Sequence, residues 1–151
     1  MKYKIHITKL LISGLFLSLS FSQECDEGTI FMNNYLGNEE ICVPDSFATT
    51  IQSNFQAFYI INSVHTGNDV AASEDWVGAF SSSGECVGAQ QWDVSQCVGD
   101  VCAVPAMGVD PLLAITSGYM SAGDTLTFQI FDASTNQYLD ATASEEFSWN
   151  D

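Results

Sequence analysis

Short apolar runs separated by polar turn residues dominate the chain after its first 22 residues. The runs are rich in β-branched and aromatic residues, and Gly, Ser, Asn and Asp interrupt them roughly every 8 to 12 residues. No long stretch of this part repeats its apolar positions with the period of a helix. The pattern predicts an all-β fold, an antiparallel β-sandwich of the jelly-roll or immunoglobulin-like kind.

The clearest strand patterns lie in the middle and in the last third of the chain. Phe55–Val64 is almost continuously apolar, and we expect it to be a central strand. Asp75–Trp92 predicts a hairpin that turns at Ser81–Glu85. Thr125–Phe131 alternates apolar and polar positions, and Ser134–Gln137 predicts the tip of the hairpin that follows it.

The first 22 residues have a different pattern. Lys2, Lys4 and Lys9 give a basic start, Leu10–Phe21 is apolar but too short to span a membrane, and Ser20–Ser22 resembles a cleavage site. We therefore expect a secretory signal peptide here, and an exported protein that is secreted or held at the cell surface, with no membrane span. The remaining 129 residues (151 − 22) suffice for one domain.

All the cysteines follow the predicted signal peptide: Cys25, Cys42, Cys86, Cys97 and Cys102. In an exported chain cysteines form disulfides, and an odd number leaves one over. Sequence alone does not determine connectivity. We favour the neighbouring pairs Cys25–Cys42 and Cys97–Cys102, because each would close a loop without strong structure of its own. Cys86 would then be a free thiol.

The cysteine pattern also suggests how the domain is organised. The first predicted disulfide closes a loop-rich N-terminal segment over residues 23–46. We expect this segment to form one domain with a β-sandwich over residues 47–151.

Charge is distributed very unevenly. All three Lys and Arg residues lie in the predicted signal peptide, whereas all 19 Asp and Glu residues follow it, so the exported part carries a formal charge of 0 − 19 = −19. Such a chain repels nucleic acid, anionic lipid and sulfated polysaccharide, all of which are bound by Lys and Arg. Three explanations of the acidity remain open: a solvated surface in a salty habitat, a Ca²⁺ site where carboxylates converge, or a cationic partner that covers the surface.

The best candidate for calcium is a string of oxygen-bearing residues at alternate positions: Asp132, Ser134, Asn136 and Asp140. It resembles the start of a calcium loop, but Gln137 stands where such a loop needs glycine. A polar hairpin tip explains the same residues, and both interpretations stay open.

Catalytic patterns are weak. A Ser–His–Asp triad would have to use His65, the only histidine after the predicted signal peptide. Carboxylate pairs for glycoside hydrolysis exist, but nothing in their spacing singles out two of them. We therefore expect a protein that is not an enzyme.

The Asp75–Trp92 hairpin suggests a binding groove. With Phe80 opposite Cys86, Gly78 falls directly opposite Gly88 and leaves a bare floor on one face. The side chains around that floor are Trp76, Phe80, Gln90 and Trp92. Such a groove accepts either a sugar ring or a side chain of the protein itself, and a one-residue slip in register would abolish it.

These blocks also carry a family resemblance. DWVGAF, CVGAQQWD and GDTLTFQIFDASTNQYLDA, after the lead-in CDEGTI to CVPDSF, resemble an uncharacterised module of large exported surface proteins of marine and Bacteroidota-like bacteria, cargo of type IX secretion. The resemblance covers about residues 25–150. It implies a β-sandwich at or outside the cell surface, with adhesion or glycan binding as its role. The family has no established activity, so no catalytic residues carry over from it.

We therefore expect a secreted, non-catalytic binding or adhesion module for a glycan or a cell-surface protein. The alternative is a structural subunit of an extracellular assembly or filament. That subunit would self-associate through Cys86 or through an exposed strand edge.

Overall fold

The structure, a computed structural model, describes residues 24–33, 40–99, 101–146 and 148–149. The predicted signal peptide lies outside the described residues. Two single-turn 3₁₀ helices occur, η1 (Val94–Gln96) and η2 (Ala114–Thr116). The strands are β1 (Thr29–Asn33), β2 (Glu40–Pro44), β3 (Gln56–Ile61), β4 (His65–Thr66), β5 (Asp69–Val70), β6 (Trp76–Phe80), β7 (Cys86–Gln91), β8 (Cys102–Met107), β9 (Thr127–Asp132) and β10 (Gln137–Ala141).

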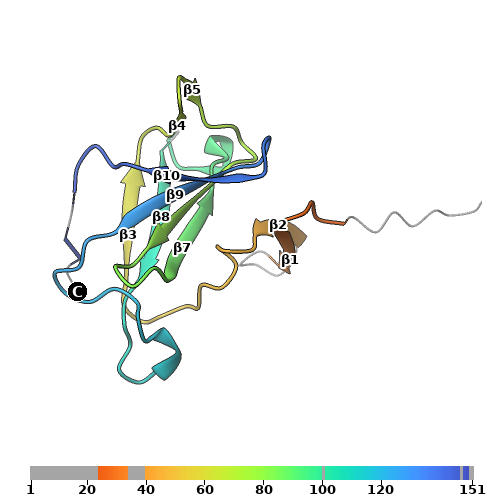
Figure 1. The fold of residues 1–151 in the computed structure, drawn as a ribbon. Helices are drawn as coiled ribbons and strands as arrows, with labels where there is room; N and C mark the ends of the chain where they lie inside the picture. Colours follow the sequence, from red (N-terminus) through yellow and green to blue (C-terminus); the bar gives the residue numbers. More distant parts are fainter. Residues whose placement is uncertain (1–23, 34–39, 100, 147, 150–151) are drawn as a thin grey trace, which may run out of the picture.

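The strands pair into one larger sheet and three two-stranded ones. The larger sheet has the order β10-β9-β6-β7, and the pairs are β1–β2, β3–β8 and β4–β5. Every pairing between these strands is antiparallel. The predicted all-β antiparallel sandwich is confirmed. Figure 1 shows the β1–β2 hairpin set to one side of the stacked strands.

The main core lies between the four-stranded sheet and the β3–β8 pair. Val77 and Val87 come from the sheet, and Val104 comes from β8. Trp92 and Met120, which follow β7 and precede β9, close the core and are almost completely buried. Complete burial of an aliphatic side chain such as that of Val77 contributes about 1.5–3 kcal/mol to stability.

A second, smaller core covers the opposite face of the four-stranded sheet, which we call its outer face. Trp76 and Phe131 project from neighbouring strands on this face, since β6 and β9 pair directly at these two residues. Val43 of the N-terminal segment and Phe47, which directly follows that segment, pack against them. The N-terminal segment is therefore the cover of this sheet face.

Two expectations about the strands are wrong. Phe55–Val64 contains β3, which pairs only with β8 among the described residues and is therefore an edge strand, not a central one. Its side chains alternate between exposed and half-buried, although its sequence is nearly all apolar. The N-terminal segment, expected to be loop-rich, contains the β1–β2 hairpin.

Candidate functional site

The β6–β7 hairpin differs by one residue from the predicted register. The pairing at Phe80 is as expected, but Val87 is an extra residue in a β-bulge, so Gly78 faces Ala89 instead of Gly88. A bulge inserts one residue into one strand and so shifts all later pairs. The predicted opposition of the two glycines is therefore wrong, and the glycines serve opposite faces of the sheet.

Gly78 lies on the outer face, beneath the ring of Phe47. A Cβ atom at this position would lie 2.6 Å from Phe47 Cε1, so only glycine leaves room for the ring. Phe47 is 3% exposed, and its ring packs edge-on against Phe80 and Tyr138. A side chain of the protein itself, that of Phe47, therefore fills the predicted groove.

Gly88 meets the backbone of β8 on the inner face. A Cβ atom here would lie 1.9 Å from the carbonyl oxygen of Pro105. No side chain can be accommodated without moving a main chain, so glycine is needed for this close approach. Gly88 therefore allows β7 and β8 to touch.

The residues predicted to bind a ligand do not form one site. Trp76 is buried in the second core beside half-buried Phe80, whereas Trp92 is buried in the main core. Gln90 is half-buried, and its side-chain amide donates a hydrogen bond to the carbonyl oxygen of Gln91 at 3.0 Å. The predicted aromatic groove is therefore wrong, because the bulge and Phe47 divide its members between two packed faces.

The proposed calcium ligands do not converge either. Asp132 Oδ1 accepts hydrogen bonds from the amide and hydroxyl of Ser134 at 2.9 and 2.7 Å, as in an ordinary turn. These bonds hold the pKa of Asp132 below its usual value. Asp140 lies three residues into β10, about 10 Å further along the strand, and accepts a bond from Gln129. Asn136 adopts a left-handed conformation with φ 54°, as a turn residue does.

Metal-ligand clusters are also missing more generally. The described residues contain no group of three or more His, Cys, Asp or Glu side chains arranged to hold a metal ion.

Both predicted disulfides are present, Cys25–Cys42 and Cys97–Cys102. Cys86 is a free thiol, buried beneath Phe47. Burial raises the pKa of this thiol, and the hydroxyl of Thr50 donates a hydrogen bond to its sulfur at 3.3 Å. A buried, protonated thiol is a poor nucleophile and is not placed to link two copies of the chain.

Two buried carboxylates organise loops. Asp75 accepts hydrogen bonds from the amides of Ala72 at 2.8 Å and Ala133 at 3.0 Å, and so joins two loops far apart in sequence. Asp110 accepts one from the Asn54 side chain at 2.6 Å and one from the amide of Leu112 at 2.8 Å. Each oxygen has a donor, as buried polar groups require, so these acids are structural.

A hydrogen-bonded latch ties the N-terminal segment to β10. The hydroxyl of Tyr138 donates to Asp45 Oδ1 at 2.6 Å and accepts from the amide of Ser46 at 3.3 Å. This bond lowers the pKa of Asp45, while burial is the main cause of the raised pKa of Tyr138. The latch and Phe47 together hold the cover over the outer face of the sheet.

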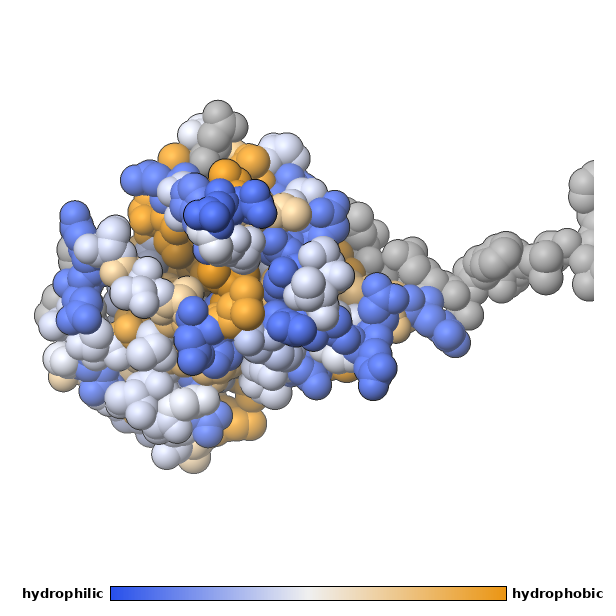
Figure 2. All heavy atoms as spheres, turned by 45° about the horizontal axis from the view of Figure 1, so that its top comes forward, coloured by the Kyte–Doolittle hydropathy of each residue, from blue (hydrophilic) through white to orange (hydrophobic). Residues whose placement is uncertain are grey.

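The outward side of the β3–β8 pair has no such cover. Phe58 and Ile60 are 57% and 65% exposed, and they pair with half-buried Pro105 and Ala103 of β8. Directly paired residues point to the same side, so these four side chains share one surface, which we call the outer β3–β8 face. Figure 2 shows exposed apolar residues gathered in patches between hydrophilic ones on one side of the molecule.

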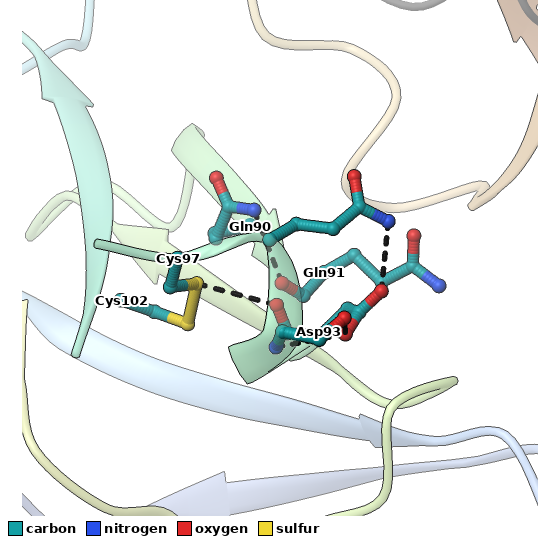
Figure 3. Close-up of a disulfide and its surroundings, with 7 residues drawn as sticks. Gln90, Gln91, Asp93, Cys97 and Cys102 are labelled. Carbon is teal, nitrogen blue, oxygen red and sulfur yellow. Dashed lines mark hydrogen bonds between the residues drawn. A yellow bond between two sulfur atoms is a disulfide. The ribbon is translucent and has the colours of Figure 1, made fainter. Parts of the chain in front are cut away.

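A groove runs beside this face. It is an open depression of the surface with a volume of about 410 Å³. Figure 3 shows the Cys97–Cys102 disulfide, which borders the groove, with Gln90 close by. The lining residues are Ile60, Gln90, Gln96, Cys97, Val98, Val101 and Ala103.

Local turn structure fixes one rim of the groove. Asp93 accepts hydrogen bonds from the amide of Ser95 at 3.0 Å and from the side chain of Gln96 at 2.7 Å. The side-chain bond from Ser95 is the main cause of the lowered pKa of Asp93. The side chain of Gln96 is therefore held at the groove by its amide nitrogen, and its side-chain carbonyl oxygen takes no part in the bond to Asp93.

The two strands that form the outer β3–β8 face contain no carboxylates. Residues 46–68, which contain β3, and residues 101–109, which contain β8, include no Asp or Glu, although the chain has 19 of them. This gap is visible in the sequence and was the available clue to the face. The hydrophobic pattern of β3 concealed it, because a run of apolar residues also fits a strand buried on both sides.

Comparison with known proteins identifies no relative. No protein family, no curated protein and no solved structure matches the chain. The described residues contain no helix long and apolar enough to cross a membrane. The resemblance to exported surface modules stays a prediction.

Proposed function

We propose that the protein is an exported, non-catalytic binding module whose contact surface is the outer β3–β8 face. The carrying observation is the exposure of Phe58 and Ile60 on β3, which like its partner β8 contains no carboxylate, in a chain otherwise dense in them. Exposed apolar patches on soluble domains mark interaction sites. The two disulfides and the predicted signal peptide support an oxidising, extracellular setting.

The ligand class that fits the groove best is a neutral glycan. Aliphatic side chains such as Val98 and Ala103 offer a surface for the apolar face of a sugar, and the amides of Gln90 and Gln96 offer partners for its hydroxyl groups. An acidic glycan would be repelled, because the chain has no Lys or Arg after residue 22.

A glycan array tests this proposal. We expect the secreted protein to bind neutral glycans, and Gln96→Ala to weaken binding about fivefold, the value of one hydrogen bond of about 1 kcal/mol. Gln137→Ala is the matched control, because it removes an equally exposed amide from β10, away from the groove. Absence of neutral glycan binding, or equal loss in both variants, would contradict the proposal.

A second candidate is a structural subunit of an extracellular assembly. The observation in its favour is the edge of β3 that no described strand pairs with, since such an edge offers hydrogen-bonding groups to another chain. Assembly through Cys86 is disfavoured, because that thiol is buried.

A further inference from the structure

The free edge of β3 is long enough to pair with another strand. β3 spans six residues, about 20 Å, and in the described part of the chain β8 is the one strand with which it pairs. Its pairing with β8 runs from Gln56 to Ile61 with no register shift, so no bulge twists the edge away.

This edge lacks the features that normally prevent pairing. Natural edge strands are protected by charged residues, proline or bulges. β3 has the sequence QAFYII and contains no charge and no proline. Its outward side chains are instead strongly exposed Phe58 and Ile60. An edge of this kind is suited to a partner.

Charge indicates which partner. A cationic protein would be attracted to the carboxylates of this chain, and β3 and β8 have none. An identical β3–β8 pair is equally free of charge, so two copies can meet here with less repulsion than through segments that carry acids. A strand edge is also complementary to itself when a two-fold axis relates the two copies.

We propose that a second copy of this chain docks on β3, with the two β3 strands antiparallel across a two-fold axis. The proposal rests on the second candidate function and specifies its contact. It forms one continuous sheet in the order β8-β3-β3-β8. Because paired residues point to the same side, a register centred on Tyr59 places Phe58 of each copy opposite Ile60 of the other.

Sedimentation equilibrium of the protein purified after export tests the pairing. We expect a monomer–dimer equilibrium that shifts toward dimer between low salt and about 0.5 M salt, where the screening length is about 4 Å. Salt strengthens this contact because it screens the repulsion between two highly acidic copies. A wild-type protein that stays monomeric at millimolar concentration in both salts would overturn the proposal.

Two matched variants locate the contact. Ile60 and Val70 are both 65% exposed, so Ile60→Glu and Val70→Glu add the same charge at equally exposed positions. Ile60→Glu should weaken dimerisation at least about tenfold, and Val70→Glu less than about twofold. Near-UV circular dichroism checks that both variants are folded, and Phe58→Glu is an independent second test. Dimerisation of Ile60→Glu and Phe58→Glu at the wild-type level would overturn the proposal.

The glycan hypothesis fails or survives separately. Gln96 lines the groove but does not belong to β3, so Gln96→Ala should dimerise like the wild type while it loses glycan affinity. Loss of dimerisation in Gln96→Ala would contradict the assignment of the contact to the β3 edge.

Discussion

The two outer sheet faces of this molecule are treated in opposite ways. The outer face of the four-stranded sheet carries aromatic residues, and it is covered by the N-terminal segment together with Phe47, which is 3% exposed. On the outer β3–β8 face, Phe58 is 57% exposed. A phenylalanine ring lies on each face, but only the ring of Phe47 is buried.

This difference separates structure from function. Covering an apolar face with the chain's own residues stabilises the fold, whereas an uncovered apolar face only lowers solubility unless it has a partner. The uncovered face also lies on the strands that lack carboxylates. We therefore assign stability to the face beneath Phe47 and partner binding to the outer β3–β8 face.

The largest expected effect comes from Gly88, which lets the two layers touch. Gly88→Ala places a methyl group on the carbonyl oxygen of Pro105, and we expect it to lower the free energy of unfolding by at least about 3 kcal/mol. Gly84→Ala is the control. Its φ of 83° would strain the backbone of an alanine, but no atom other than those of its chain neighbours lies within 4 Å of the added Cβ, so we expect the free energy of unfolding to fall by about 1 kcal/mol. Equal effects in a urea titration would refute the close contact.

Truncating the two phenylalanines compares the faces directly. Phe47→Ala should lower the free energy of unfolding by about 3–5 kcal/mol, because it leaves a cavity in the second core. Phe58→Ala should change the free energy of unfolding by less than about 0.5 kcal/mol. Urea denaturation measures both. A comparable loss in the two variants would mean that Phe58 is also a structural residue.

The Cys86 thiol reports on the cover over the outer face. It is buried below Phe47, with its pKa raised by that burial, so a thiol reagent should not label it in the native protein. Phe47→Ala should accelerate labelling at least about tenfold, because the cover then opens more often. Rapid labelling of the wild type would show that the cover is open in solution.

The smallest expected effect is that of the latch. Tyr138→Phe removes the hydroxyl that contacts Asp45, and should cost at most about 1 kcal/mol at neutral pH, since the bond is solvent-exposed. The folded state lowers the pKa of Asp45, so this stabilisation is present above the unfolded pKa of about 3.9 and is lost as pH falls through the folded pKa. The stability difference between wild type and variant should therefore shrink on acidification, and a constant difference would contradict the latch.

The fold class, the two main hairpins and both disulfides could be predicted from the sequence, because alternation, turn residues and cysteine spacing are local features. The register at Gly78 could not. It depends on a bulge at Val87 and on Phe47, which is distant in sequence. Sequence patterns near a hairpin contain no information on which distant residue covers it.

The position of β3 was missed for a related reason. The run QAFYII is nearly all apolar, and only the packed structure reveals that alternate residues face solvent. Hydropathy alone therefore favoured a central strand. The absence of acids from residues 46–68 was the better indicator, because this segment contains the strand that we propose makes the contact.

Amide hydrogen exchange of β3 tests the central claim most directly. The protein would be compared at micromolar and millimolar concentration in about 0.5 M salt, where repulsion between copies is screened. β3 should become protected as the concentration rises, whereas β1, which also exposes apolar residues such as Phe31, should not change. Protection that appears in β1 and not in β3, or in neither, would contradict the pairing of two copies of the chain through the β3 edge.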